Sequence, residues 1–483
     1  MLQLQRPDLF QERAYINGDW VGQATTERIQ VVNPATQEPI GSVPKLGAQE
    51  TAQAIEAAQH AFNSWRHTTA TERAALLRKW FELLLQHKDD LAAILTAEQG
   101  KTLAESAGEV QYGAAYFEWF SEEAKRIYGQ TIPGPAHNKR IVVQREPIGV
   151  CVAITPWNFP SSMIARKVGA ALAAGCTIVV KPASQTPFSA LALAVLAEEA
   201  GIPKGVFSVV TGDASSIGGE MTSNEQVRKL SFTGSTAVGR KLMEQSAPQL
   251  KKLSMELGGN APFIVFEDAD LDAAVEGALA SKFRNSGQTC VCANRIYVHD
   301  AVYDRFSQKL LDAVSKLKIG AGTDQDVDLG PLIDRAAVDK VDELIQDALA
   351  KGATLLAGGK QQQTGTLLYP PTVLGDMTAD MRIAQEEIFG PVAPLFRFKT
   401  EDEVIQAANN TEFGLASYFY TQDLGRANRV AEALEYGMVG INSGMISNPS
   451  APFGGVKQSG FGREGSSFGI EDYTVLKYSL TAF

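Results

Sequence analysis

A cysteine in a polar turn is the first residue of this 483-residue chain whose type and setting could do chemistry. Cys290 ends the stretch FRNSGQTC, just after a helix predicted over residues 268–284, and is expected to be better exposed than Cys151, which lies in an apolar run. The thiolate is the reactive form, and at a reference pKa of about 8.5 only a few per cent of a thiol is ionised at neutral pH. The alternative interpretation of Cys290 is a small buried hydrophobic residue.

Two further segments carry groups that could assist such a nucleophile. Glu256 lies in MELGGN, where a predicted strand runs into glycines, and a partly desolvated carboxylate there could act as a general base. Asn158 lies in TPWNFP, again at a strand end, and its side-chain amide could donate to an oxyanion. Each residue alone fits an ordinary loop equally well, so the interpretation depends on all three together.

The elements that would position these residues alternate between strand and helix. Short apolar runs of buried-strand type occur at 148–154, 177–180, 206–210 and 230–232. A helix is predicted over 160–174 with Gly175 as its cap, and another begins at Thr186-Pro187, a capping residue followed by proline at the first helical position. This alternation indicates βαβ units and a parallel sheet, whose ligands lie at the carboxyl ends of the strands.

The chain before that sheet reads as helical, and the chain after it begins a second α/β unit. Apolar residues spaced three and four apart predict helices over about 52–65 and 104–128, and another that starts near Thr71. FIVF at 263–266 and RIYV at 295–298 are the first strands expected in the second unit. We place the boundary near Leu257-Gly258-Gly259, and the length of the chain agrees with two or three domains.

Two glycine-rich motifs match nucleotide-binding patterns only in part. Gly460 to Gly465 fits G-x-G-x-x-G, but no strand precedes it and the chain is nearly over, so a glycine-rich turn is the better interpretation. Gly234 to Gly239 resembles a P-loop but lacks the Lys-Ser/Thr pair after its second glycine. The turn at Gly234 still matters, because it lies between a strand and a helix whose free N–H groups favour a phosphate.

Composition excludes several classes of function. A net charge of -11 argues against a nucleic-acid partner, and no apolar stretch is long enough to predict a membrane span. Four cysteines in so long a chain do not form a disulfide framework, no metal site is predicted, and without a recognisable export signal a cytoplasmic location is expected. The histidines, which lie at positions 60, 67, 87, 137 and 299, give little support to a Cys–His hydrolase dyad.

Taken together, the segments resemble the aldehyde dehydrogenase superfamily. PWNFP, FTGST, ELGGNAPF, GQTC and EEIFGPV occur in the order and at the spacings of that family. The resemblance implies an α/β fold with a parallel-sheet, Rossmann-type cofactor domain (1–129 and 147–257) and a second α/β catalytic domain (258–458). It also implies a small oligomerisation element (130–146 and 471–483), and therefore a homodimer or homotetramer.

The resemblance also implies roles for individual residues. Cys290 corresponds to the family's nucleophile, Glu256 to its general base, and Asn158 with the Cys290 backbone N–H to its oxyanion donors. The implied cofactor contacts are Thr155, Pro156, Trp157, Lys181, Ser184, Gly234, Ser235, Glu387 and Phe389. The implied reaction passes from aldehyde to a thioester on Cys290 with reduction of NAD(P)+, and water activated by Glu256 then releases the acid.

The chain resembles the members of that superfamily that oxidise succinate semialdehyde at three further positions, which are Arg166, Arg284 and Ser447. Arginine suits a carboxylate because its guanidinium forms paired, charge-assisted hydrogen bonds. Either arginine could instead be a surface cation. Glutarate semialdehyde is the main rival substrate, since one methylene discriminates by only about 1–3 kcal/mol, and a broader aldehyde dehydrogenase is a further alternative.

Two finer predictions concern the cofactor and a second cysteine. Many NAD-preferring members of the family have glutamate where this chain has Ser184, so NADP is expected to be preferred over NAD, with Lys181 adding positive charge. Cys290 and Cys292 could close into a strained disulfide under oxidant and mask the nucleophile, although Cys292 could equally serve only packing.

Two other classes of function remain as alternatives. A non-catalytic structural or binding protein of this fold would not need Cys290, Glu256 and Asn158 together. A CoA-acylating relative normally lacks the general-base glutamate, so Glu256 favours hydrolysis of the thioester.

Overall fold

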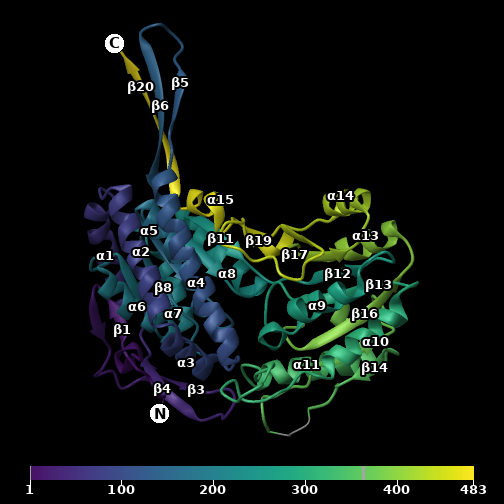
Figure 1. Cartoon of the computed structure of the whole chain (residues 1–483). Coiled ribbons are helices and arrows are strands. Elements are labelled where there is room, and N and C mark those ends of the chain that lie inside the picture. Colours follow the sequence, from purple (N-terminus) through teal and green to yellow (C-terminus); the bar gives the residue numbers. More distant parts are fainter. Residues whose placement is uncertain (1, 362–364) are drawn as a thin grey trace.

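The computed structural model describes residues 2–361 and 365–483. Its two largest sheets consist mainly of parallel strands and are accompanied by helices (Figure 1). The parallel strands of the first sheet, in sheet order, are β11 (Lys252–Glu256), β10 (Val227–Thr233), β7 (Val150–Ile154), β8 (Thr177–Lys181) and β9 (Phe207–Val209). Antiparallel strands extend both edges, with β19 (Gly460–Phe461) beside β11, and β1 (Ala14–Ile16) then β2 (Asp19–Val21) beside β9.

The first sheet is packed with the helices of the N-terminal half. These are α1 (Ala48–Trp65), α2 (Ala70–Gln86), α3 (Lys88–Gln99), α4 (Leu103–Glu123), α5 (Ser162–Ala174), α6 (Phe188–Ala200), α7 (Ala214–Ser223) and α8 (Thr236–Ser246). The helical periodicity predicted at 52–65 is present in α1, whose buried face includes Ile55, Phe62 and Trp65. The N-terminal third also holds strands that the helical pattern did not indicate: β1, β2 and the hairpin of β3 (Arg28–Val32) with β4 (Pro39–Pro44).

The capping residues predicted for the start of α6 are wrong. Pro187 is the N-cap residue itself and not the first helical residue, and the Thr186 hydroxyl has no hydrogen-bond partner among the described residues. The free N–H groups of Phe188 and Ser189 instead donate to the buried Glu98 carboxylate at 2.7 and 2.8 Å. A carboxylate near a helix N-terminus also interacts favourably with the helix dipole. The cap therefore comes from a residue about 90 positions away, which local sequence cannot reveal.

The second sheet has a parallel core with one antiparallel edge strand. Its strands, in sheet order, are β14 (Thr354–Ala357), β15 (Thr372–Gly375), β16 (Val392–Phe398), β13 (Ala293–His299), β12 (Ala261–Val265), β17 (Ala416–Tyr420) and β18 (Met438–Ile441), with only β14 antiparallel. Its helices include α9 (Leu271–Lys282), α10 (Tyr303–Val314), α11 (Arg335–Ala350), α12 (Arg382–Gln385), α13 (Glu401–Asn409) and α14 (Leu424–Ala433). The short helix α15 (Ser466–Glu471) returns to pack on α4 and α5.

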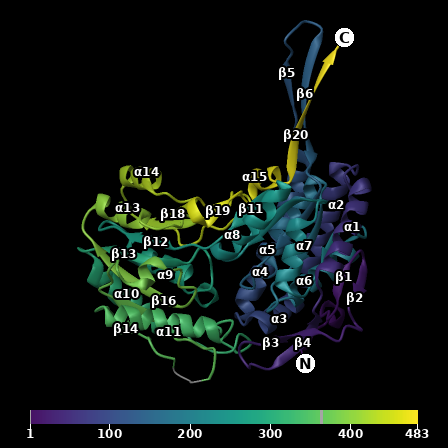
Figure 2. The same cartoon turned by 180° about the vertical axis from the view of Figure 1, so that it is seen from behind.

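A three-stranded ribbon projects from the body of the molecule, as both views show (Figures 1 and 2). It consists of β5 (Gln130–Pro133), β6 (Lys139–Pro147) and β20 (Thr474–Ala482), with β20 antiparallel to β6 along its whole length. Large apolar side chains on the ribbon are open to solvent, Leu476 being 67% and Tyr478 72% exposed.

No helix in the described part of the chain is long and apolar enough to cross a bilayer.

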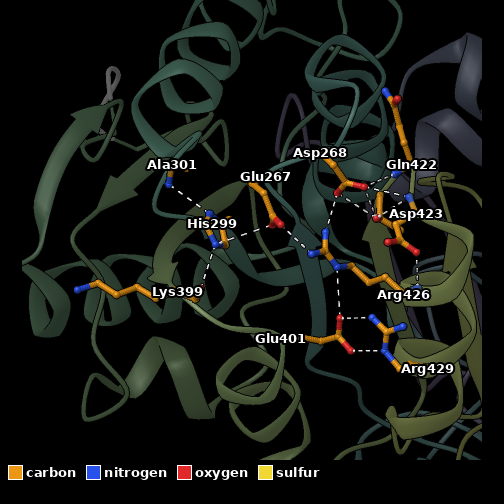
Figure 3. Close-up of polar contacts among 11 residues, drawn as sticks. Glu267, Asp268, His299, Ala301, Lys399, Glu401, Gln422, Asp423, Arg426 and Arg429 are labelled. Carbon is orange, nitrogen blue, oxygen red and sulfur yellow. Dashed lines mark hydrogen bonds and ion pairs between the residues drawn. The ribbon is translucent and has the colours of Figure 1, made fainter.

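The carboxyl edge of the second sheet is occupied by the protein's own charges. Figure 3 shows the Arg426 guanidinium between three carboxylates, with hydrogen bonds to Glu267 (2.7 Å), Asp268 (2.8 Å) and Glu401 (3.3 Å). Asp268 follows β12 and also accepts the N–H groups of Gln422 and Asp423, which follow β17, at 2.9 Å each. This edge, where α/β folds usually bind ligands, is thus closed by a network that joins neighbouring strand ends.

We expect Arg426→Ala to lower the melting temperature by about 2–8 °C, because hydrogen bonds to charged groups contribute roughly 1–3 kcal/mol and this one arginine serves three carboxylates. Differential scanning fluorimetry measures the shift. The matched control is Lys309→Ala, which removes an exposed ion pair with Asp272 and should change the melting temperature little. Equal melting temperatures for the two variants would show that the network adds no stability.

Candidate active site

The segment that carries Cys290 is held in an unusual backbone conformation. Asn285, Ser286 and Gly287 have φ values of 51°, 55° and 77°, so three consecutive residues lie in the left-handed region after α9. Such a conformation is costly for residues with a Cβ and is concentrated at functional sites. The Ser286 hydroxyl donates to the Gly330 carbonyl at 2.7 Å and the Gln288 side chain accepts the Ile333 N–H at 2.9 Å, which fixes the turn.

Cys290 itself is half-buried at the end of this turn. Burial raises the pKa of its thiol to about 12, while the positive charge of Arg166 acts in the opposite direction. A thiol with so high a pKa is protonated at neutral pH, and its reaction as a nucleophile requires a proton acceptor. No acceptor among the described residues binds the Cys290 backbone N–H, which leaves this donor available.

Asn158 lies four residues beyond the end of β7 and is joined directly to the cysteine turn. Its Nδ2 donates to the Gln288 carbonyl at 3.0 Å. A side-chain amide has two N–H groups, so one remains for another acceptor. The structure thus brings the predicted oxyanion donor within one hydrogen bond of the segment that bears the predicted nucleophile.

Glu256 ends β11 and is 2% exposed. Neither of its carboxylate oxygens has a hydrogen-bond partner among the described residues. Burial, and then the negative charge of Glu464, raise the pKa of Glu256 well above its usual value, and Arg166 and Lys167 oppose this rise. An unpartnered buried carboxylate with a raised pKa has the properties of a general base.

Glu464 is a component of the site that sequence reasoning missed. Its carboxylate pairs with two cations of α5, Arg166 at 2.5 Å and Lys167, and Lys167 also donates to the Thr233 hydroxyl at 2.7 Å. Burial is the largest influence on the pKa of Glu464, but these two cations outweigh it and hold the pKa below the usual value. The signal was available: Glu464 is the one acidic residue in the glycine-rich motif 460–465, which contributes no dinucleotide loop but delivers this carboxylate.

Two cavities lie beside the cysteine turn. One, of about 270 Å³, is lined by residues that include Phe159, Arg166, Arg284, Thr289, Val291 and Ser447. The other, of about 360 Å³, is lined by residues that include Trp157, Asn158, Gly234, Ser235, Cys290, Glu387 and Phe389. Because Thr289 and Val291 face the first cavity and Cys290 faces the second, a group bound in either one would be adjacent to the nucleophile.

The larger cavity has features that fit a dinucleotide. Gly234 and Ser235 precede α8, whose first N–H groups favour a phosphate, and a Cβ at Gly234 would lie 2.5 Å from the Phe232 ring. Glu387 accepts the Gly259 N–H at 3.0 Å with one carboxylate oxygen, and burial raises its pKa to about 7. Sequence reasoning missed Lys340, which lines the cavity and donates to the Glu387 carbonyl at 2.6 Å.

Of the remaining predicted cofactor residues, Phe389 precedes β16 of the second sheet, and the others follow strands of the first sheet. Phe389 has a φ of 56°, which is rare for an aromatic residue, and meets the Trp157 ring edge-on at 5.6 Å between centroids. Thr155 and Pro156 follow β7 directly, while Lys181 and Ser184 follow β8 outside the lining of the larger cavity. Lys181 donates to the Pro182 carbonyl at 2.8 Å, and burial lowers its pKa to about 8.

The two predicted substrate arginines occupy different settings in the smaller cavity. Arg166 is buried in its ion pair with Glu464 and lies over the Phe453 ring at 4.2 Å. Arg284 stacks over Phe159 at 5.2 Å and has no carboxylate partner anywhere in residues 2–361 and 365–483. Ser447 lies in the lining of the same cavity.

Cys292 is buried and its thiol donates to the Lys282 carbonyl at 3.1 Å. Its pairing with Cys290 under oxidant stays a prediction. In the described part of the chain no group of three or more histidine, cysteine, aspartate or glutamate side chains is arranged to hold a metal ion.

Comparison with known proteins places this site in a family. The model of the aldehyde dehydrogenase family matches residues 20–479, so the chain belongs to the aldehyde dehydrogenase family. The resemblance predicted from the motifs and the α/β fold predicted with it are thereby confirmed.

Individual relatives are similar over their full lengths. The chain is 63% identical to succinate-semialdehyde dehydrogenase [NADP(+)] GabD of Escherichia coli (strain K12), covering 99% of each chain. It is also 63% identical to glutarate-semialdehyde dehydrogenase of Pseudomonas aeruginosa, again over 99% of each. The crystal structure of succinate-semialdehyde dehydrogenase from Burkholderia pseudomallei is 64% identical and superposes with a TM-score of 0.98 over 100% of both chains.

We expect Glu256→Gln to retain a first burst of reduced cofactor and then to stall, because the neutral amide cannot take a proton from water at the thioester. Stopped-flow absorbance at the reduced-nicotinamide band separates the burst from turnover. Native turnover should rise with increasing pH, since the Glu256 carboxyl has a raised pKa and acts as a base only when it is ionised.

The matched control for this prediction is Glu244→Gln, an exposed glutamate on α8, which should turn over normally. Cys290→Ala should show neither burst nor turnover. Sustained turnover by Glu256→Gln at the native rate would exclude this residue as the deacylating base.

Proposed function

We propose that the protein oxidises succinate semialdehyde to succinate with NADP+ as the preferred cofactor and NAD+ as a weaker alternative. The observation that carries the proposal is Arg284, a cation without a carboxylate partner among the described residues, in a cavity that adjoins the cysteine turn. An unpaired guanidinium there suits the carboxylate of a short semialdehyde, through charge-assisted hydrogen bonds. The name of the Escherichia coli relative supports both the substrate and the cofactor.

The reaction follows from the groups around Cys290. Cys290 gives its proton to solvent water and adds through sulfur to the aldehyde carbon, and the alkoxide so formed receives hydrogen bonds from the Asn158 amide and the Cys290 N–H. Each such donor stabilises the transition state by roughly 3 kcal/mol. NADP+, when held by the residues of the larger cavity, supplies the acceptor for the hydride that leaves this carbon.

Hydrolysis of the resulting thioester completes the cycle. Glu256 takes a proton from a water molecule, whose oxygen adds to the thioester carbonyl. The tetrahedral adduct then collapses and its C–S bond breaks. The carboxylic acid leaves the site, and the Cys290 thiolate that remains is protonated again. The buried, unpartnered oxygens of Glu256 are suited to this work because they are not already engaged.

Glutarate semialdehyde is the second candidate substrate. It keeps the aldehyde and the carboxylate and is one methylene longer, which a pocket discriminates by only about 1–3 kcal/mol. The Pseudomonas aeruginosa relative, as similar as the Escherichia coli one, is named for it. Comparison of kcat/KM for the two semialdehydes decides between them.

The ribbon and the sheets support further proposals about assembly. We propose that residues 130–146 and 471–483, which contain the ribbon strands except Pro147, bind another copy of the chain in a homodimer or homotetramer, since exposed Leu476 and Tyr478 would be covered there. We also propose that the chain divides into a cofactor domain (1–129 and 147–257) and a catalytic domain (258–458).

We further propose a cytoplasmic location, which agrees with the four free thiols of the chain.

We expect Arg284→Ala to raise KM for succinate semialdehyde by roughly 10-fold or more, since one charge-assisted hydrogen-bonding group contributes about 1.5–3 kcal/mol. Butanal, which has no carboxylate, should be oxidised with little change. Steady-state kinetics with both aldehydes measures the difference, and Arg305→Ala, at an exposed position on α10, is the control. Equal losses for butanal and the semialdehyde would refute a carboxylate-binding role.

We expect Ser184→Glu to shift the cofactor preference from NADP+ towards NAD+. A carboxylate in the turn after β8 would repel the 2′-phosphate of NADP+ and accept a hydrogen bond from the 2′-hydroxyl of NAD+. The ratio of kcat/KM for the two cofactors should fall by at least about 10-fold, which corresponds to about 1.4 kcal/mol. A native preference for NAD+, or a ratio that the substitution leaves unchanged, would contradict the prediction; Ser184→Ala is the control for loss of the hydroxyl alone.

A further inference from the structure

A buried lysine contacts the main chain at the oxyanion donor. The side chain of Lys101, in the turn between α3 and α4, is closed to solvent. Its Nζ donates to the Asn158 carbonyl at 2.7 Å and to Glu109 at 2.6 Å, and lies 3.8 Å from the centre of the Phe159 ring. An ammonium has three N–H donors, and these three neighbours take them. Although Lys101 lines the smaller cavity, it keeps no N–H for a substrate.

The same turn is joined to the cysteine segment. Gln99 donates to the Asn285 side chain at 3.0 Å, and Asn285 donates in turn to the Asn158 carbonyl at 3.0 Å. The Asn158 carbonyl therefore accepts one hydrogen bond from Lys101 and one from the strained turn that precedes Cys290. The Asn158 peptide is thus restrained both by the turn between α3 and α4 and by the turn that precedes Cys290.

Glu109 extends this restraint to the next helix. Its second carboxylate oxygen accepts the N–H groups of Ser161 and Ser162 at 2.9 and 3.2 Å, at the start of α5. The Lys101–Glu109 pair thus holds the segment 158–162 at both of its ends. A fully buried ion pair has a large desolvation cost and adds little net stability, so a role in fixing geometry accounts better for it.

We propose that Lys101 is a positioning residue of the oxyanion site: by fixing the Asn158 peptide it aims the free N–H of the Asn158 amide at the alkoxide. The proposal rests on the proposed function, because it takes the Asn158 amide as the oxyanion donor. A displacement of about 1 Å in such a group costs on the order of 100-fold in rate.

The test compares Lys101→Met with Lys101→Met/Glu109→Gln. Methionine keeps much of the apolar stem and removes the donors, and the second substitution removes the unpaired buried charge while its amide oxygen still accepts the Ser161 N–H. We expect both variants to lose about 10- to 100-fold in kcat and in the rate of the first turnover. KM for succinate semialdehyde should stay within about 3-fold, and butanal should suffer equally, since Lys101 has no N–H for a carboxylate.

Stability and thiol reactivity separate positioning from general damage. The double variant should regain the melting temperature that the single variant loses, without regaining kcat. Iodoacetamide should alkylate Cys290 at the native rate in both, because this reaction forms no alkoxide, and the other cysteines are buried. Lys309→Met, at an exposed ion pair, is the matched control and should behave as the native protein.

Three outcomes would overturn the inference. Recovery of kcat in the double variant would mean that Lys101 only neutralises Glu109. A higher KM for the semialdehyde with butanal unaffected would make Lys101 a substrate ligand. Alkylation that slows in step with kcat would mean that the cysteine turn has collapsed. Full activity of Asn158→Ala would instead refute the oxyanion assignment in the proposed function, which distinguishes the two failures.

Discussion

The hydrogen bond from the Asn158 amide to the Gln288 carbonyl is the contact on which the site depends. One partner follows β7 of the first sheet, and the other precedes β13 of the second. The groups that line the larger cavity divide in the same way: Gly234 and Leu257 follow strands of the first sheet, whereas Gly258 and Phe389 precede strands of the second. The carboxyl edge of one sheet thus meets the amino edge of the other, and the chemistry is assembled where they meet.

The second sheet has a different arrangement at its own carboxyl edge. That edge is closed by Arg426 and its carboxylates, so the strand ends are fixed by the protein itself. A rigid second sheet is what the cysteine turn needs, because three consecutive left-handed residues persist only when their surroundings hold them. The second sheet therefore has reactive groups at its amino edge and a stabilising network at its carboxyl edge.

The parts of this fold that sequence could predict are those with a local pattern. Buried runs such as 148–154 and the helix that Gly175 ends appear where apolar periodicity and cap chemistry placed them. The residues that were missed act across long separations: Lys101 reaches Asn158 over 57 positions, and Lys167 reaches Glu464 over 297. The start of α6 failed for the same reason, since the distant Glu98 carboxylate took over from Thr186. Charged residues that meet only in the folded chain leave no periodic signal.

The two arginines of the smaller cavity differ in burial, and they therefore differ in what their charges can do. Arg166 is fully buried, and its charge lowers the pKa of both Cys290 and Glu256 against the effect of their own burial. Glu464 neutralises that charge at 2.5 Å, so Arg166 acts mainly on the electrostatics of the reacting groups, although its Nε has no hydrogen-bond partner among the described residues. Arg284, six residues before the nucleophile, contacts the Phe159 face and a methionine sulfur. Neither contact supplies a negative charge, and Glu105, on whose pKa Arg284 has a lowering effect, forms no ion pair with it, so an anionic substrate gains more from Arg284 than from Arg166.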